Sequence, residues 1–142
     1  MNEQLQTINA SNLKVINFLE NNKIKVLNTE EANYGRYLIL NTLNLSNQQR
    51  EKYLLVFKRD YFRAFGRIFQ IFGESGMGET INQEDLQNAV RLGVRNLLFT
   101  YPTGFIYEIS VSDFLIHSHK RKNDYEDKWT RSINIKHLKR LN

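Results

Sequence analysis

The residues best suited to chemistry lie near the middle of the chain, directly after an apolar run. Residues 53–57, Tyr-Leu-Leu-Val-Phe, lead into Lys58, Arg59 and Asp60. The unbroken run predicts a strand that is covered on both faces. Lys58 falls on the same face as Leu54 and Val56, because side chains of a strand alternate. Lys58 therefore either snorkels at the strand tip or enters a pocket, where its charge would stabilise a reacting phosphate.

Basic and aromatic residues alternate in the segment that follows. Arg59, Arg63 and Arg67 recur every four residues. Four phenylalanines recur at steps of three and four: Phe62, Phe65, Phe69 and Phe72. This spacing predicts an amphipathic helix over residues 59–72, with the arginines in one stripe. The stripe is either a solvated basic face or a row of guanidinium groups that binds phosphates.

The C-terminal residues form a second basic region. Six of its cations are candidate contacts for a polyanion: Lys120, Arg121, Lys122, Lys136, Lys139 and Arg140. Tyr125 and Trp129 lie among them and either stack on bases or anchor the segment to the core. His117 and His119 have a spacing that suits a metal, but the sequence offers no third ligand, so we expect a structural or surface role.

Charge is distributed unevenly along the chain, whose net charge is +5. Residues 50–72 carry a net +4 and residues 117–142 a net +5, whereas residues 73–116 carry −4. Such polarisation indicates an anionic partner, most commonly nucleic acid, and we expect DNA before RNA. The chain has no cysteine, which excludes disulfides and thiolate metal sites. It shows neither a signal peptide nor an apolar run of membrane-spanning length, so we expect a cytoplasmic protein with no membrane partner.

The elements that would position these residues follow from periodicity and capping. We expect a helix from residues 11–12 to 21, strands at 24–27, 37–40 and 53–58, and the helix at 59–72. A further helix at 80–92 precedes a hairpin of strands at 96–101 and 105–109. A short helix at 112–116, an edge strand at 131–135 and a terminal helix at 136–141 complete the chain. The strand at 105–109, as an edge, would pair between subunits of a homodimer.

These elements predict an α/β or α+β fold in a single domain. A central mixed sheet of about five strands is flanked by helices in the order αβββαββ. Residues 1–116 would form the core, and residues 117–142 a basic extension packed on the same domain.

This order over residues 11–110 is similar to the core of the PD-(D/E)xK nuclease superfamily, which includes restriction endonucleases and archaeal Holliday-junction resolvases. The resemblance implies an acid near the second strand and an acid-x-lysine on the third. Lys58 matches the lysine, but the acid before it falls at Val56, and residues 37–40 contain no acid. Under this resemblance Glu20, in the first helix, would stand for the helix-borne acid that some members use, and Glu30, Glu31 or Asp60 would substitute in space for the missing acids. We take Lys58, Glu20 and Asp60 as the candidate catalytic residues.

We therefore expect a nucleic-acid-binding protein on a nuclease-like scaffold that is catalytically degenerate. Its phosphate contacts would be Arg59, Arg63, Arg67 and the six cations of the C-terminal region. Two alternatives stay open. One is an active, Mg²⁺-dependent endonuclease or resolvase-like phosphodiesterase with its carboxylates rearranged around Lys58. The other is a protein–protein interaction module without nucleic-acid binding.

Overall fold

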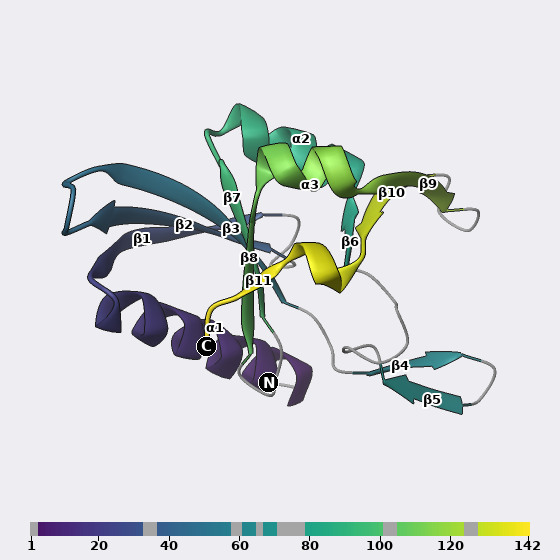
Figure 1. Cartoon of the computed structure of the whole chain (residues 1–142). Helices are drawn as coiled ribbons and strands as arrows, with labels where there is room; N and C mark the ends of the chain where they lie inside the picture. Colours follow the sequence, from purple (N-terminus) through teal and green to yellow (C-terminus); the bar gives the residue numbers. More distant parts are fainter. Residues whose placement is uncertain are drawn as a thin grey trace.

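A six-stranded mixed sheet forms the centre of the structure (Figure 1). Its strands lie in the order β1 (Ile24–Ala32), β2 (Tyr37–Asn44), β3 (Arg50–Phe57), β7 (Asn96–Thr100), β8 (Ile106–Ser110) and β11 (Lys139–Arg140). β3 and β7 are parallel, and every other neighbouring pair is antiparallel. The computed structural model describes residues 3–32, 37–57, 61–64, 67–70, 79–100, 105–123 and 128–142. The predicted α+β class and mixed sheet are confirmed.

Helices cover both faces of this sheet (Figure 1). On one face, α1 (Glu3–Asn21) contributes the buried residues Val15 and Leu19. On the other, α2 (Gln83–Arg91) and α3 (Val111–His117) contribute Leu86 and Phe114 among others. None of the helices in these described ranges is long and apolar enough to cross a membrane.

β3 is buried from both sides, as its unbroken apolar run predicts. Tyr53 and Leu55 belong to the apolar cluster under α1, whereas Leu54 and Val56 belong to the cluster under α2 and α3. Each of the four side chains is at most 4% exposed. The alternation that fills both clusters also fixes the register of β3, since a slip by one residue would exchange its two faces.

The ends of α2 follow directly from its sequence. Asn82 precedes the helix, and its side-chain oxygen accepts the backbone N–H groups of Glu84 and Asp85. Such a cap satisfies amide groups that have no partner within the helix. Just past the last turn, Gly93 has φ +95°, a left-handed conformation that glycine adopts without steric cost.

The C-terminal residues form strands where the sequence predicted an edge strand and a helix. β10 (Lys128–Ile133) is the middle strand of a three-stranded sheet, between β6 (Glu79–Asn82) and β9 (His119–Asn123). The predicted terminal helix is reduced to one 3-10 turn, η1 (Ile135–His137), followed by β11. Buried Ile133 and Leu138 flank this turn and tie it to the core, so tertiary packing overrides the helical pattern.

β11 also changes the expected role of residues 105–109. β8 is not an open edge, because Lys139 and Arg140 pair with Glu108 and Tyr107. The edge that was expected to pair between subunits is therefore occupied within the chain over these two residues.

The predicted helix over residues 59–72 is wrong. The structure has two short strands here, β4 (Tyr61–Ala64) and β5 (Arg67–Gln70), paired antiparallel with Phe62 opposite Phe69. Aromatic residues favour strands, and Gly66 in the middle of the segment disfavours a helix. Arg63 lies opposite Ile68 and Arg67 opposite Ala64, so these two arginines do not form a helical stripe.

β1 is longer than predicted and contains an irregularity that matters below. The strand was expected to end at residue 27, but it continues through residues 28–32. The register with β2 shifts between Val26 and Asn28, which leaves Leu27 as an extra residue. Such a bulge turns the residues beyond it to the opposite face.

Candidate functional site

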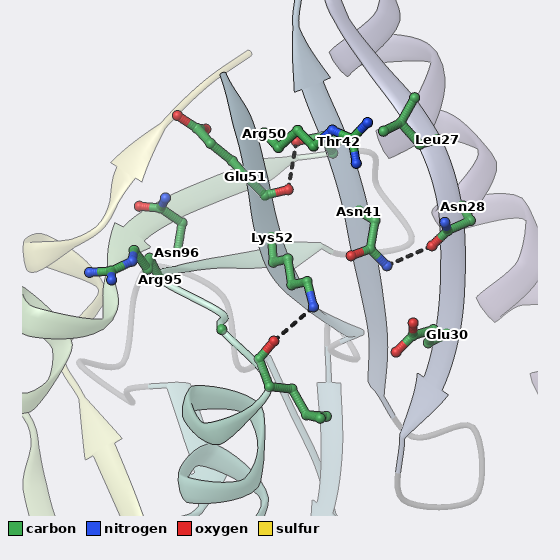
Figure 2. Close-up of a pocket in the computed structure, with 12 residues that line it drawn as sticks. Leu27, Asn28, Glu30, Asn41, Thr42, Arg50, Glu51, Lys52, Arg95 and Asn96 are labelled. Atoms are coloured by element: carbon green, nitrogen blue, oxygen red, sulfur yellow. Dashed lines mark hydrogen bonds between the residues drawn. The ribbon is translucent and has the colours of Figure 1, made fainter. Parts of the chain in front are cut away.

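A pocket of about 470 Å³ opens where β1, β2 and β3 approach the C-terminal end of α2. Figure 2 shows its polar lining. β1, β2 and β3 contribute Asn28, Glu30, Asn41, Thr42, Arg50, Glu51 and Lys52, the segment after α2 contributes Gly93 and Arg95, and β7 contributes Asn96. Its volume lies within the range of small-molecule sites.

A row of three polar residues crosses the strands in this pocket. Asn28 pairs with Asn41, and Asn41 pairs with Lys52. The bulge at Leu27 brings Asn28 into line with the row, because without it Asn28 would share the face of Val26, which packs toward α1. The Asn41 Nδ2 group donates to Asn28 Oδ1 at 2.6 Å (Figure 2).

Lys52 joins the sheet to α2. Its Nζ donates to the backbone oxygen of Leu92, the C-terminal capping residue, at 2.8 Å (Figure 2). The Arg95 N–H donates to the backbone oxygen of Lys52 at 3.3 Å. A cation at the C-terminal end of a helix is favoured by the helix dipole and by the unpaired carbonyls there. Lys52 thus has a structural task within the pocket.

Arg50 and Arg95 are the cations of this pocket that remain available. The structure gives neither guanidinium group a hydrogen-bond or ion-pair partner among the described residues. Guanidinium groups and asparagine amides together suit a polar anion such as a phosphate ester. Among the described residues no group of three His, Cys, Asp or Glu side chains could hold a metal ion.

Two acidic residues lie near Tyr53, and one of them, Glu51, lines the pocket. The Tyr53 hydroxyl donates to Glu51 Oε2 at 2.8 Å. Burial raises the pKa of Tyr53 well above its ordinary value, and the bond to Glu51 raises it further. Burial also raises the pKa of Glu108, against the opposing effect of its cross-strand partner Lys139. Glu51 therefore has a structural role, because it accepts the hydrogen bond of the buried Tyr53 hydroxyl.

A second candidate surface lies on the small sheet. Trp129 of β10 is 47% exposed, and the Lys120 ammonium group lies 4.7 Å from the centroid of its ring. Lys122 is the cross-strand partner of Trp129. Lys120, Lys122 and Trp129 share one face of the sheet, because cross-strand partners and residues two apart point the same way. Arg131, also on β10, donates to the hydroxyl oxygen of Ser118, the residue between α3 and β9, at 3.0 Å.

The other predicted cations are dispersed. Lys136 lies in η1, and Lys139 and Arg140 lie in β11 at the edge of the large sheet. The Arg140 guanidinium carbon is 3.9 Å from the centroid of the Phe105 ring. Arg121 lies in β9 between Lys120 and Lys122. The structure therefore brings together Lys120 and Lys122 with Trp129, but places β11 on a different sheet.

The structure describes one of the three predicted catalytic residues, Glu20. Lys58, Arg59 and Asp60 lie outside the described residues. Glu20 is exposed on α1. Arg63 and Arg67 belong to the β4–β5 hairpin.

His137, the third histidine of the chain, lies beside His117, one of the two histidines noted in the sequence. The rings of His117 and His137 are stacked, with centroids 4.3 Å apart and planes at 12°. Partial burial lowers the pKa of His137, with further contributions from His117, Lys136 and His119. No sequence pattern linked His137 to His117, because η1 and the end of α3 meet only through the fold.

Sequence reasoning also missed the polar row on β1–β3. Lys52 precedes Leu54 and Val56 at the same period that singled out Lys58, so alternation alone was a usable signal. Asn28 and Asn41 had no such signal, because their alignment depends on the bulge. Comparison of the chain with protein-family models, curated proteins and solved structures finds no match.

Proposed function

We propose that the protein binds nucleic acid, and DNA in preference to RNA, through the face of the three-stranded sheet that carries Trp129. The observation that carries the proposal is the position of Lys120 and Lys122 beside a half-exposed indole ring. Lysines neutralise phosphates, and aromatic rings stack on bases.

The charge of the chain supports this proposal. Residues 117–142 carry a net +5, and Lys120, Lys122, Lys136, Lys139 and Arg140 are all exposed. Affinity that comes from such contacts falls as salt rises, because bound counterions are released on association. The contacts are independent of base sequence, so we expect weak sequence preference.

The element order supports a nuclease-like scaffold for this binding function. α1 and the β1–β2–β3 meander are followed, after β4 to β6, by α2 and by β7, which runs parallel to β3. The strands that would carry catalytic acids are poor in them. β2 has no Asp or Glu, and the acid of β3 is Glu51, which accepts from Tyr53. We therefore propose that the scaffold is catalytically degenerate.

The test is a fluorescence-anisotropy titration of labelled duplex, single-stranded and branched DNA at two salt concentrations, with and without Mg²⁺. The double variant Lys120→Gln/Lys122→Gln should weaken binding and reduce the salt slope by about 0.7–0.9 per lost phosphate contact. The matched control is Lys14→Gln/Lys25→Gln, which removes the same charge from exposed lysines of α1 and β1.

Three outcomes would count against the proposal. Equal losses in the two double variants would show that net charge, and not this face, determines affinity. No binding to any of the DNAs at low salt would favour a protein–protein interaction module. Shortened DNA on a denaturing gel, seen only with Mg²⁺, would replace the degenerate scaffold by an active nuclease.

A further inference from the structure

A hollow of about 450 Å³ lies between α2 and Trp129. The helix lines it with a polar stripe at steps of four, Gln83, Gln87 and Arg91, and with Glu84 and Asn88 beside that stripe. The stripe follows from the amphipathic sequence of α2, which turns Leu86 and Ala89 into the core. The apolar side of the hollow is therefore the indole, and the opposite side is polar.

The position of Trp129 follows from strand pairing. β10 pairs with β6 as far as Thr130, whose partner is Asn82. Asn82 is also the residue at which the chain enters α2. Trp129 precedes Thr130 in β10 and lies beyond the end of the β6 pairing, so on this side it lies beside the first turns of α2 instead of a strand. The ring is left with an open side that the sheet does not cover, consistent with its exposure of 47%.

The polar groups of the hollow suit a base better than a phosphate. Glu84 and Arg91 offset each other in charge, so the hollow itself does not attract an anion. Gln83 and Gln87 carry amides, which both donate and accept, as base edges do. Gln83 Oε1 is buried and has no hydrogen-bond partner among the described residues. An acceptor left in this state costs free energy, which a donor from a ligand would recover after rotation of the amide.

We propose that this hollow receives one unpaired nucleobase of a single DNA strand, stacked on Trp129. The amides of Gln83 and Gln87 contact the base edge, and Lys120 and Lys122 contact the adjoining phosphates. This inference rests on the proposed function and narrows it. Bases in a duplex are already stacked and paired, so only a single strand or an extruded base fits the hollow.

Trp129 is the only tryptophan of the chain, so its intrinsic fluorescence reports on this site alone. The full-length protein is titrated with oligothymidylate of about 12 nucleotides. A second titration uses an abasic strand of equal length, which keeps the phosphates and lacks the bases. Oligothymidylate should quench Trp129 and bind more tightly, whereas the abasic strand should bind weakly without quenching.

Variants test the contact directly. Trp129→Leu should weaken binding of oligothymidylate by roughly 5- to 140-fold and leave the abasic strand unchanged. Gln87→Ala, on the exposed side of α2, should weaken it by roughly 2- to 12-fold. Gln49→Ala, an exposed glutamine of the β2–β3 turn, is the matched control and should have no effect. Far-UV circular dichroism establishes that each variant is folded.

The outcomes separate this inference from the function on which it rests. If oligothymidylate and the abasic strand bind equally and Trp129 is not quenched, the base site is wrong and phosphate binding stands. If neither strand nor a duplex binds, both proposals fall. If Trp129→Leu does not fold, the comparison of the two strands on the natural protein and the Gln87→Ala result still decide the question.

Discussion

The ammonium group of Lys52 lies 2.8 Å from the backbone oxygen of Leu92, and this contact joins the central strand β3 to the end of α2. The two residues are 40 positions apart in the chain. Both residues line the pocket of Figure 2, and α2 also lines the Trp129 hollow. The contact therefore connects the pocket to the helix of the second site.

Replacing Lys52 should destabilise the fold without removing apolar contacts. Lys52→Met is expected to lower the free energy of unfolding by about 1–2 kcal/mol, because a charge-assisted hydrogen bond and a favourable helix-dipole interaction are lost. Urea unfolding monitored by circular dichroism measures this change. Lys25→Met, at an exposed position of β1, is the control. Equal stability of the two variants would contradict the structural role of Lys52.

The core under α3 depends on Phe114. Its side chain is fully buried, and its ring lies 6.4 Å from that of Phe99 at an angle of 30°. Phe114→Ala should cost about 3–5 kcal/mol, from lost transfer free energy and the cavity left behind. Leu115→Ala, at the neighbouring exposed position, should change stability by no more than about 0.5 kcal/mol. Thermal unfolding measures the stability of the two variants. Similar losses of stability would contradict the burial of Phe114 between α3 and the sheet.

Glu108 should make the protein less stable as pH rises through the weakly acidic range. Its pKa is raised above 4.5, so the folded state holds the proton to higher pH than the unfolded chain does. Stability therefore falls as pH rises from 4.5 through the raised pKa. Glu108→Gln should remove this slope and raise stability at neutral pH by less than about 1 kcal/mol, because solvent screens the partly exposed group.

The measurement is urea unfolding of both proteins at a series of pH values from 4 upward, with Glu31→Gln, at an exposed position of β1, as the control. A variant that is less stable than the natural protein at neutral pH would show that the attraction of Lys139 outweighs burial.

His137, which stacks on His117, should make the protein less stable as pH falls, whereas Glu108 makes it less stable as pH rises. The pKa of His137 is lowered below 6.5, so the unfolded chain binds its proton first as pH falls. Stability is therefore present above pH 6.5 and declines as pH falls from there through the lowered pKa. His137→Phe should keep an aromatic ring in the stack and flatten this decline. Stability curves for the two proteins between pH 5 and 8 test the prediction, and parallel curves would refute it.

Local patterns predicted the elements whose burial is continuous or whose ends are capped. The apolar run of β3, the helix α2 and the β7–β8 hairpin were all visible in the sequence, because each depends on neighbours in the chain. The helix over residues 59–72 failed, because phenylalanine spacing fits a helix and a hairpin alike. The terminal helix failed because Leu138 is held in the core and β11 pairs with β8.

The candidate sites were predicted less completely than the fold. Trp129 and the lysines of β9 were recognised from composition, but the hollow beside them needs α2, which lies some 40 residues earlier in the chain. The row of Asn28, Asn41 and Lys52 depends on a one-residue bulge, which no local sequence pattern predicts. Register and bulges are thus the information that periodicity lacks.

The parallel pairing of β3 with β7 has a consequence for how the chain folds. β1, β2 and β3 form a meander of sequence neighbours, and β7 with β8 forms a hairpin, so each part of the sheet can form quickly from local contacts. Only the β3–β7 ladder joins these two parts within the sheet. That ladder closes the long connection from Phe57 to Asn96, and its loop-closure entropy is the main kinetic barrier we expect. We therefore expect the formation of the β3–β7 pairing to be the step that sets the folding rate.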